Sequence, residues 1–464
     1  MRPRKNSPRE IPGLLQRISR SIFPDPLIPR TDSERKRYLV KNLILHFRPA
    51  TVPEKTLRFT LTWGLGGMAA VLVLLQIGTG LLLKFAFEPT PVAAYASIQS
   101  LQNDVPFGQL IRNLHHWSAH LLVLIVFLHM LRVFFTGAFQ PPRQFNWIIG
   151  WAMFGTVLTA NFTGYLLPYD QLAYWAVTVS TGMLEYVPVI GSRLREVVRG
   201  GGDIGPATLR IFFAIHTALV PAALVLFMGF HFWRVRKSGG LVIPRGPDEG
   251  PVDDPVRVAT LPNLLLREVV TALMLIAGVL LLSVFLNAPL EDPANPGLSP
   301  NPTKAPWYFA GLQELLLHLH PTFAVFVIPF LITIAVIMLP YMNYEVDTRG
   351  IWFASRTGRR MAVIACIIAL VITPLVIVVD EGIVDANVFA SVVQPVIWKG
   401  LVPTILLVAA IVGFYLIMKR RFSASNNEAI QAVFVLLIVA FVVLTITGVW
   451  FRGPGMKLVV PWHR

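Results

Sequence analysis

The amino-acid sequence predicts an all-α integral membrane protein. The chain has 464 residues, of which 55% are hydrophobic and only 14% charged, and its mean hydropathy is +0.62. Soluble domains carry about 25% charged residues, so this composition argues against a cytosolic enzyme. Nine apolar stretches are long enough to cross a bilayer, and helices are the default there because every backbone polar group must be paired inside lipid. The single cysteine excludes a disulfide scaffold.

The expected transmembrane helices fall near residues 60–84, 110–135, 146–166, 208–233, 265–287, 321–342, 361–379, 399–418 and 429–451. With nine spans, most of the 40 Lys and Arg residues lie on the side of the N-terminus. The positive-inside rule then predicts a cytoplasmic N-terminus and an external C-terminus. With eight spans, the C-terminal tail would lie on the cytoplasmic side instead. The net charge of +15 is therefore explained by the membrane topology, and we expect lipid rather than nucleic acid as a partner.

Composition divides the chain into five parts, at residues 1–59, 60–236, 237–263, 264–380 and 381–464. The first part is basic and contains no span. Its apolar residues at helical spacing between Ile11 and Ile22 fit an amphipathic helix on a membrane surface. A solvated basic tail fits the same residues equally well. The second is a four-helix bundle, the third a Gly- and Pro-containing cytoplasmic linker, and the last adds two further helices. Two external loops, at 167–207 and 288–320, are longer than turns, and the prolines in the second favour a stiff, packed loop.

Four histidines lie at matched intervals on the second and fourth spans. His115 and His129 are 14 residues apart, which is about four helical turns or about 21 Å, and His216 and His231 are 15 apart. Antiparallel helices would pair His115 with His216 toward the external side and His129 with His231 toward the cytoplasmic side. Two histidines without a carboxylate or thiolate suit structural zinc poorly. Haem supplies four nitrogens and needs only two axial ligands, so the pattern predicts two bis-histidine haems.

Glycines and arginines repeat the same spacing around these histidines. The first span holds Gly66 and Gly80, and the third holds Gly150 and Gly164; both pairs are 14 apart. Glycine destabilises a helix, so these four predict close approach of a flat, bulky group, although ordinary helix packing explains each one singly.

Arg112 and Arg132 each lie three residues beyond a histidine, toward the nearer surface, where they would pair with haem propionates. Anchoring at the membrane interface explains Arg132 well and Arg112 less well. We expect structural or interfacial roles for His116 and His120, which have no partner at the same interval.

Several of these motifs together resemble the cytochrome b subunit of the quinol:cytochrome c (or plastocyanin) oxidoreductases. They are Arg112–Ala119 (RNLHHWSA), Leu128–Arg132 (LHMLR), Gly164–Gln171 (GYLLPYDQ), His216, and His231–Lys237 (HFWRVRK), and the resemblance runs from about residue 40 to 380. The 15-residue interval in the fourth span is similar to the chloroplast and cyanobacterial branch, in which the protein is commonly split into two chains. Here both parts are joined.

The resemblance implies two b-type haems and a quinol oxidation site at the external side. The family's Pro-Glu-Trp-Tyr tetrapeptide reads Ala-Pro-Trp-Tyr here, ending in Trp307 and Tyr308, so the family's proton-accepting glutamate is absent. Asp170 and Glu314 are the nearest acidic alternatives, with His318 third, because a desolvated carboxylate can act as a base near neutral pH. A turn role for Asp170 and an interfacial role for Glu314 are equally compatible with the sequence.

The resemblance also implies a route for electrons and a set of partners. One electron from quinol would pass to an external Rieske-type iron–sulfur protein and a cytochrome c-type acceptor, the other through the haems to a quinone near Arg236, with coupled proton translocation. Members of the family form homodimers, so a homodimer is expected here. The expected location is a bacterial cell (inner) membrane. The altered tetrapeptide favours menaquinol as the substrate. Gly64 takes the position of the cysteine that binds an extra haem in the chloroplast-like branch, so that covalent haem is not expected.

Two other classes of protein fit part of these observations. A dihaem anchor of another quinone-linked dehydrogenase accounts for the histidines but not for the Pro-rich external loop. A non-redox transporter with interior histidines predicts no haem at all.

Overall fold

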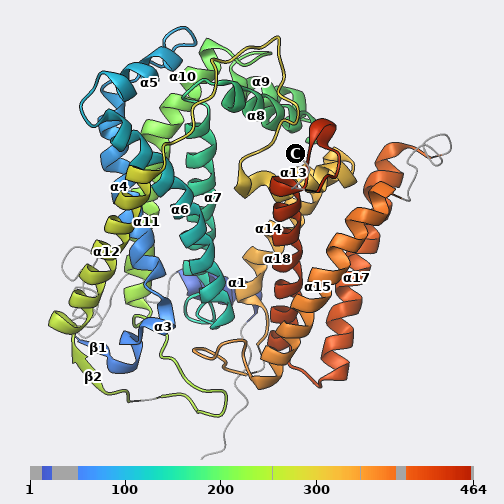
Figure 1. Cartoon of the computed structure of the whole chain (residues 1–464). Coiled ribbons are helices and arrows are strands. Elements are labelled where there is room, and N and C mark those ends of the chain that lie inside the picture. The colour runs from blue at the N-terminus through green and yellow to red at the C-terminus, as the bar shows by residue number, and fades with distance from the viewer. Residues whose placement is uncertain (1–12, 23–50, 253, 345, 383–392, 461–464) are drawn as a thin grey trace, which may run out of the picture.

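The computed structural model describes residues 13–22, 51–252, 254–344, 346–382 and 393–460, and these form a helical protein in two neighbouring groups of long helices (Figure 1). One short antiparallel sheet joins β1 (Thr51–Pro53) to β2 (Arg257–Ala259). The predicted all-α membrane fold class is therefore confirmed.

The first group of long helices comprises α4 (Leu65–Lys84), α6 (Gly108–Phe135), α7 (Gln144–Tyr165), α10 (Pro206–Ala214) continuing into α11 (Val220–Lys237), and α12 (Thr260–Phe285). The second comprises α14 (Ile328–Met338), α15 (Arg356–Gly382), α17 (Val402–Arg421) and α18 (Asn426–Trp450). Short helices cover the two ends: α1 (Leu14–Ile22), α3 (Phe59–Thr62), α5 (Ala94–Asn103), α8 (Gln171–Gly182), α9 (Gly191–Arg199) and α13 (Trp307–His318).

Eight helices among the described residues are long and apolar enough to cross a membrane. The span predicted near 146–166 also forms a long helix, α7, but it carries polar residues such as Asn146 and Asn161 and does not belong to those eight. Helix α7 packs between α6 and α11, where protein rather than lipid surrounds much of it. Each of the nine predicted stretches is thus helical, and the chain is a multi-pass membrane protein.

A π-helical turn separates α10 from α11 at Ile215–Leu219, and similar turns begin the helices that continue as α14 and α17, at Thr322–Val327 and Ile397–Leu401. Each turn is followed after one residue by a proline. Proline lacks an N–H and its ring clashes with the carbonyl four residues earlier, so the preceding turn must widen. A π turn accommodates about one extra residue. Because His216 lies in the first of these turns, its 15-residue interval to His231 covers about the same rise as the 14-residue interval in α6.

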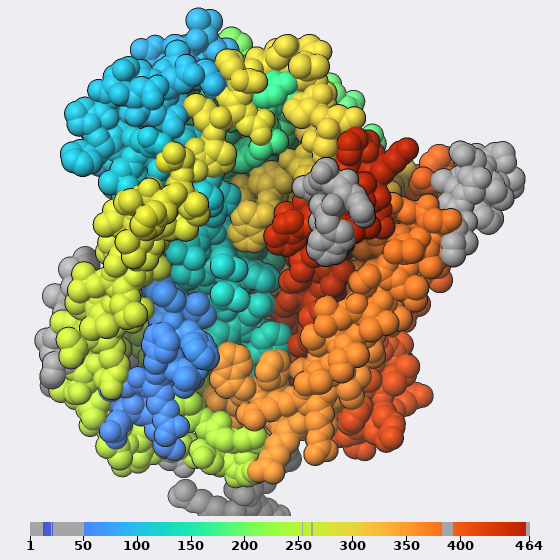
Figure 2. Space-filling view, in the orientation of Figure 1, coloured from blue at the N-terminus to red at the C-terminus, as the bar shows by residue number. Residues whose placement is uncertain are grey.

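The two ends of the bundle differ in construction. The α13 end, at the top of Figure 1, carries α5, α8, α9 and α13, and the loop between α12 and α13 (yellow in Figure 2) crosses over it. The α1 end carries α1, α3 and the small sheet.

Part of the amphipathic helix predicted in 1–59 is present as α1, which contacts Tyr341. Arg17 of α1 donates to the Tyr341 carbonyl at 3.0 Å, and the Ser21 hydroxyl lies 2.9 Å from the Tyr341 hydroxyl. The rest of that segment, at 1–12 and 23–50, lies outside the described residues. The expected linker at 237–263 is held in part by β2, which pairs with β1.

Candidate functional site

The structure brings the four histidines together in the predicted pairs. The ring centroids of His115 and His216 are 6.1 Å apart with an angle of 77° between the ring planes. Those of His129 and His231 are 6.5 Å apart at 74°. Helices α6, α7, α11 and α4 hold both pairs inside the first group of helices, one pair toward each end.

These separations fit one metal ion between each pair. A metal–nitrogen bond of about 2.0 Å on each side, plus about 1.1 Å from nitrogen to ring centroid, places the centroids about 6.2 Å apart. Direct stacking or hydrogen bonding of the rings requires no such gap. The donor set of two imidazoles in an apolar bundle suits haem iron, which brings its own four equatorial ligands.

Each of the four predicted glycines faces one of the four histidine rings. A Cβ atom added at Gly66 or at Gly80 would lie 3.2 Å from the Cε1 atom of His129 or His115, respectively. At Gly164 the added Cβ would lie only 2.5 Å from His216 Cε1, whereas at Gly150 it would lie 4.0 Å from the ring of His231. The glycines therefore admit the imidazole rings between the helices, a role more specific than general room for a flat group.

Hydrogen bonds fix the orientation of the pair nearer the α13 end. The Nδ1 atom of His115 lies 2.9 Å from the Thr79 hydroxyl, and His216 Nδ1 lies 3.0 Å from the Ala160 carbonyl. A ring whose Nδ1–H donates to such an acceptor keeps Nε2 bare for a metal. Gln76 adds a bond from its side chain to the His115 carbonyl at 2.7 Å. Thr79 and Gln76 were not among the predicted site residues, although both lie on α4 within about one turn of Gly80.

The pair nearer the α1 end lines a cavity with unsatisfied polar atoms. This cavity is bounded by His129, His231, Arg132 and Asn146, together with Gly66 and Gly150. His129 Nδ1, Arg132 Nη2 and Asn146 Oδ1 are buried there without a hydrogen-bond partner among the described residues. Buried polar groups are normally paired, so three such atoms around one cavity indicate space for a group with a polar edge. Carboxylates on a flat cofactor would satisfy the guanidinium of Arg132.

Arg112 does not present a free guanidinium to the other pair. Its Nη1 and Nη2 atoms donate to the carbonyls of Ala288 at 2.8 Å and Pro289 at 2.6 Å. The neighbouring Asn113 accepts from the Ala288 N–H at 2.8 Å. Arg112 therefore holds the start of the Pro-rich loop against α6, and its expected contact with a propionate has no support in these hydrogen bonds.

The tetrapeptide at the start of α13 contacts α6 through a histidine. The indole N–H of Trp307 donates to His120 Nδ1 at 2.9 Å, and the ring centroid of Tyr308 lies 6.2 Å from that of His120. Tyr308 is buried, and burial raises the pKa of its phenol, which keeps the hydroxyl protonated as a donor. His120, expected to be structural, thus connects the four-helix bundle to the candidate quinol site.

Asp170 is the N-cap of α8 and also binds the Pro-rich loop. Its Oδ1 accepts from the Ala173 N–H at 2.8 Å and its Oδ2 from the Glu291 N–H at 3.1 Å. Burial raises the pKa of Asp170, although these two N–H groups and Arg112 oppose the shift. The side chain thus has the turn role considered from the sequence, and it retains a carboxylate with a raised pKa.

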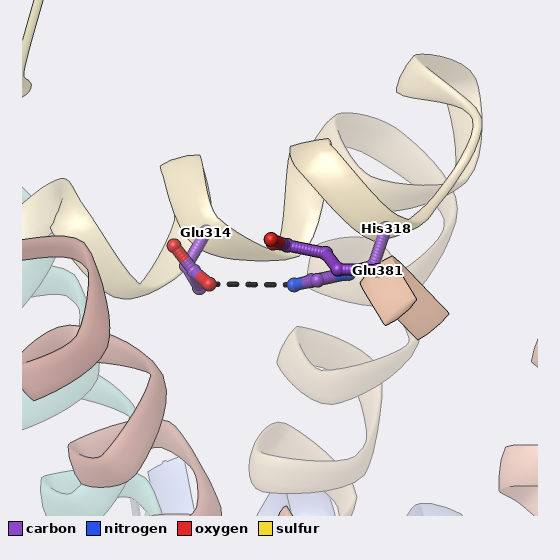
Figure 3. A group of neighbouring side chains, drawn as sticks. All are labelled: Glu314, His318 and Glu381. Carbon is purple, nitrogen blue, oxygen red and sulfur yellow. Dashed lines mark hydrogen bonds and ion pairs between the residues drawn. The ribbon is translucent and has the colours of Figure 1, made fainter. Parts of the chain in front are cut away.

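Glu314 is fully buried, with 0% of its surface exposed, and is bound by Arg452 just beyond α18. The Nε of Arg452 donates to Glu314 Oε2 at 2.9 Å, and His318 Nε2 lies 3.3 Å from Glu314 Oε1. Burial alone would raise the pKa of Glu314, but the bonds from His318 and Arg452 hold that pKa below its usual range. Glu314, His318 and Glu381 converge on one point (Figure 3), which the sequence could not show because 63 residues separate the last two.

Two further positions, Arg236 and Gly64, were singled out from the sequence. Arg236 lies in the last turn of α11, and its Nη1 is buried without a hydrogen-bond partner among the described residues. Gly64 has a φ of +66°, and an added Cβ would lie 3.0 Å from Thr271. A cysteine at Gly64 would be strained by both features.

The fold and the paired histidines define an integral membrane protein of the cytochrome class. Residues 52–239 match the family model described as cytochrome b/b6/petB. The cytochrome b6 of Heliomicrobium gestii is 42% identical over 188 residues, which are 40% of this chain and 87% of that protein. The cytochrome b6 of Cyanidium caldarium is 45% identical over 176 residues, 38% of this chain and 81% of the relative.

The chain belongs to the cytochrome b/b6 family, and the family carries b-type haem and takes part in electron transport. A solved structure titled hyperthermophilic respiratory complex III matches with a TM-score of 0.61 at 22% identity, and the match covers 90% of this chain and 95% of the other. At that identity the likeness concerns the fold alone. It extends beyond the part shared with the cytochrome b6 relatives and includes most of the second group of helices.

Proposed function

We propose that the protein is the dihaem cytochrome b subunit of a quinol oxidoreductase of the cytochrome bc type. The observation that carries the proposal is the geometry of the two histidine pairs, each spaced to hold one iron between two imidazoles and each lined by glycines. His115 with His216 and His129 with His231 would be the ligands, and Arg132 would bind a propionate. When bound, the haems would accept and pass on single electrons.

We assign quinol oxidation to the α13 end and locate it on the external side. Trp307 and Tyr308 would line the quinol pocket, with the Tyr308 hydroxyl as a hydrogen-bond donor. Asp170 and Glu314 are the candidate proton-accepting carboxylates in place of the glutamate missing from the tetrapeptide. Arg236, whose Nη1 atom is buried, would serve a quinone at the α1 end.

The positive-inside distribution supports a cytoplasmic α1 end in a bacterial cell membrane. The five-part division of the chain is proposed with the boundaries given above. Partners would be a Rieske-type iron–sulfur protein and a cytochrome c-type acceptor, because this chain's single cysteine cannot bind such a cluster. A homodimer and menaquinol are proposed from the family resemblance.

A reduced-minus-oxidised absorbance spectrum of the purified complex tests the proposal. We expect b-type bands, two haems per chain, and reduction of these haems by a menaquinol analogue. A protein that shows no b-type absorbance would refute the haem assignment. A protein with haems that dithionite reduces and quinol does not would refute quinol oxidation.

A further inference from the structure

Five charged or titratable side chains meet at the α13 end, where three separate parts of the chain come together. Glu314 and His318 lie on α13, Asp380 and Glu381 in the last turn of α15, and Arg452 directly after α18. Arg452 binds Glu314 at its Nε and Nη2 and pairs with Glu381 through Nη1. We call these five residues the α13 cluster.

The cluster contains a continuous series of contacts from the protein interior toward the surface. His318 Nε2 lies 3.3 Å from Glu314 Oε1, and His318 Nδ1 lies 2.7 Å from Asp380 Oδ2. The exposed fraction of the side chain rises along this series, from 0% at Glu314 to 13% at His318 and 39% at Asp380. An imidazole between two carboxylates, one buried and one exposed, is suited to carry a proton.

Both protonation states of His318 are provided with partners. The neutral ring can donate from Nδ1 to Asp380 while Nε2, 3.5 Å from Arg452 Nη2, accepts from that guanidinium. The charged ring donates to Asp380 and to Glu314. Burial lowers the pKa of His318, but the bonds and charges of Glu314 and Asp380 outweigh it and raise the pKa above the usual value.

The same helix connects the cluster to the candidate quinol site. Glu314 follows Trp307 by seven residues, which places both on one face of α13 about 10.5 Å apart along its axis. The end of α18 braces this helix: Lys304 Nζ donates to the Val449 carbonyl at 2.9 Å. Gly311 lies so close to α18 that an added Cβ would be 2.6 Å from Thr445 Oγ1.

We propose that Glu314, His318 and Asp380 form a relay that carries a proton from quinol oxidation to the external water. This inference rests on the proposed function. In the relay, Glu314 passes the proton to Nε2 of neutral His318, and the Nδ1–H bond breaks as its proton moves to the Asp380 carboxylate and then to water. One proton is transferred and no electron moves within the relay.

Arg452 and Glu381 position the relay. The point on which Glu314, His318 and Glu381 converge could suit a divalent cation, but the Arg452 guanidinium already binds both carboxylates there (Figure 3 shows the three converging side chains). We therefore assign the cluster to proton transfer rather than metal binding.

His318→Gln tests the relay because glutamine retains hydrogen bonding but does not titrate in this range. In the assembled complex, the rate of haem reduction by a menaquinol analogue should fall at least about 10-fold, since positioned acid–base groups contribute about 100-fold or more. The rise of the rate with pH near the pKa of His318 should also disappear. Asp380→Asn, at a partly exposed site that tolerates substitution, should lower the rate less, and Asp380→Glu should restore it.

His320→Gln is the matched control, because His320 lies on the same segment and, within the described part of the chain, its Nδ1 accepts from the nearby Thr322 N–H alone. It should leave the rate and pH profile unchanged. Dithionite-reduced spectra verify that each variant retains its haems. A His318→Gln or Asp380→Asn complex with the wild-type rate and pH profile would overturn the relay, whereas a wild-type complex that quinol cannot reduce would overturn the proposed function instead.

Discussion

Replacing Gly164 by alanine should remove one haem and leave the other in place. A Cβ at this position would lie 2.5 Å from Cε1 of His216, 3.0 Å from Nδ1 and 3.2 Å from Nε2. Ordinary contact begins near 3.4 Å, so the imidazole must retreat by about 0.9 Å. Its Nδ1 is already held by the Ala160 carbonyl at 3.0 Å, which limits a simple rotation of the ring.

Gly150→Ala is the matched control. Its added Cβ would lie 4.0 Å from the ring of His231, an ordinary contact, while the gain in helix propensity is the same at both sites, about 1 kcal/mol. Overpacking at Gly164 should cost about 1–3 kcal/mol, so the helix gain offsets part of the loss in overall stability. The binding of haem, rather than the melting temperature, is therefore the informative measurement.

We expect Gly164→Ala to contain about one haem per chain, with the remaining spectrum that of the His129/His231 haem, and Gly150→Ala to contain two. Haem content by pyridine haemochrome, together with the difference spectrum, measures this directly. If Gly164→Ala retained two haems with an unchanged spectrum, the close approach of His216 to α7 would not control haem binding by His216. The proposed role of the glycines in admitting the imidazole rings would then be wrong.

Three further predictions concern single side chains. His129→Leu should remove the haem nearer the α1 end and spare the other; loss of both in a folded protein would contradict independent sites. Arg132→Ala should weaken retention of that same haem, measured as haem transfer to apomyoglobin. Arg112→Ala should leave the haem content intact but lower the melting temperature, because the Ala288 and Pro289 carbonyls lose their hydrogen-bond donor. Finally, the raised pKa of His318 means that its charged form stabilises the folded state. That contribution is complete below the unfolded pKa of about 6.5 and is lost as the pH rises through the folded pKa. The difference in melting temperature between wild type and His318→Gln should therefore shrink as the pH is raised, and a constant difference would argue against titration of this group.

The last helix has a structural role that the sequence did not reveal. Helix α18 packs against α13, α15 and α17, and Arg452 at its end neutralises the buried Glu314. A buried carboxylate is costly unless it is paired, so this contact couples the C-terminal extension to the candidate quinol site. The sequence alone indicates no function for residues 381–464, because no motif in them indicates which helix they contact.

The sequence by itself determined the membrane class, the positions of the helices and the matched spacing of the histidines, because these depend on periodicity along one chain. Repeats of 14 and 15 residues specify which side chains share a helix face, whatever the neighbouring helices do. It also identified the four glycines, whose spacing copies that of the histidines.

Only the tertiary structure decided what the polar side chains of the loops contact. Arg112 binds two loop carbonyls, Asp170 caps α8, and Glu314 pairs with Arg452 across 138 residues of sequence. Such partners are chosen by how helices and loops pack in space, and a local pattern carries no record of them. The physical reason is that a buried charge or hydrogen-bonding group must find whatever partner the completed fold brings within reach.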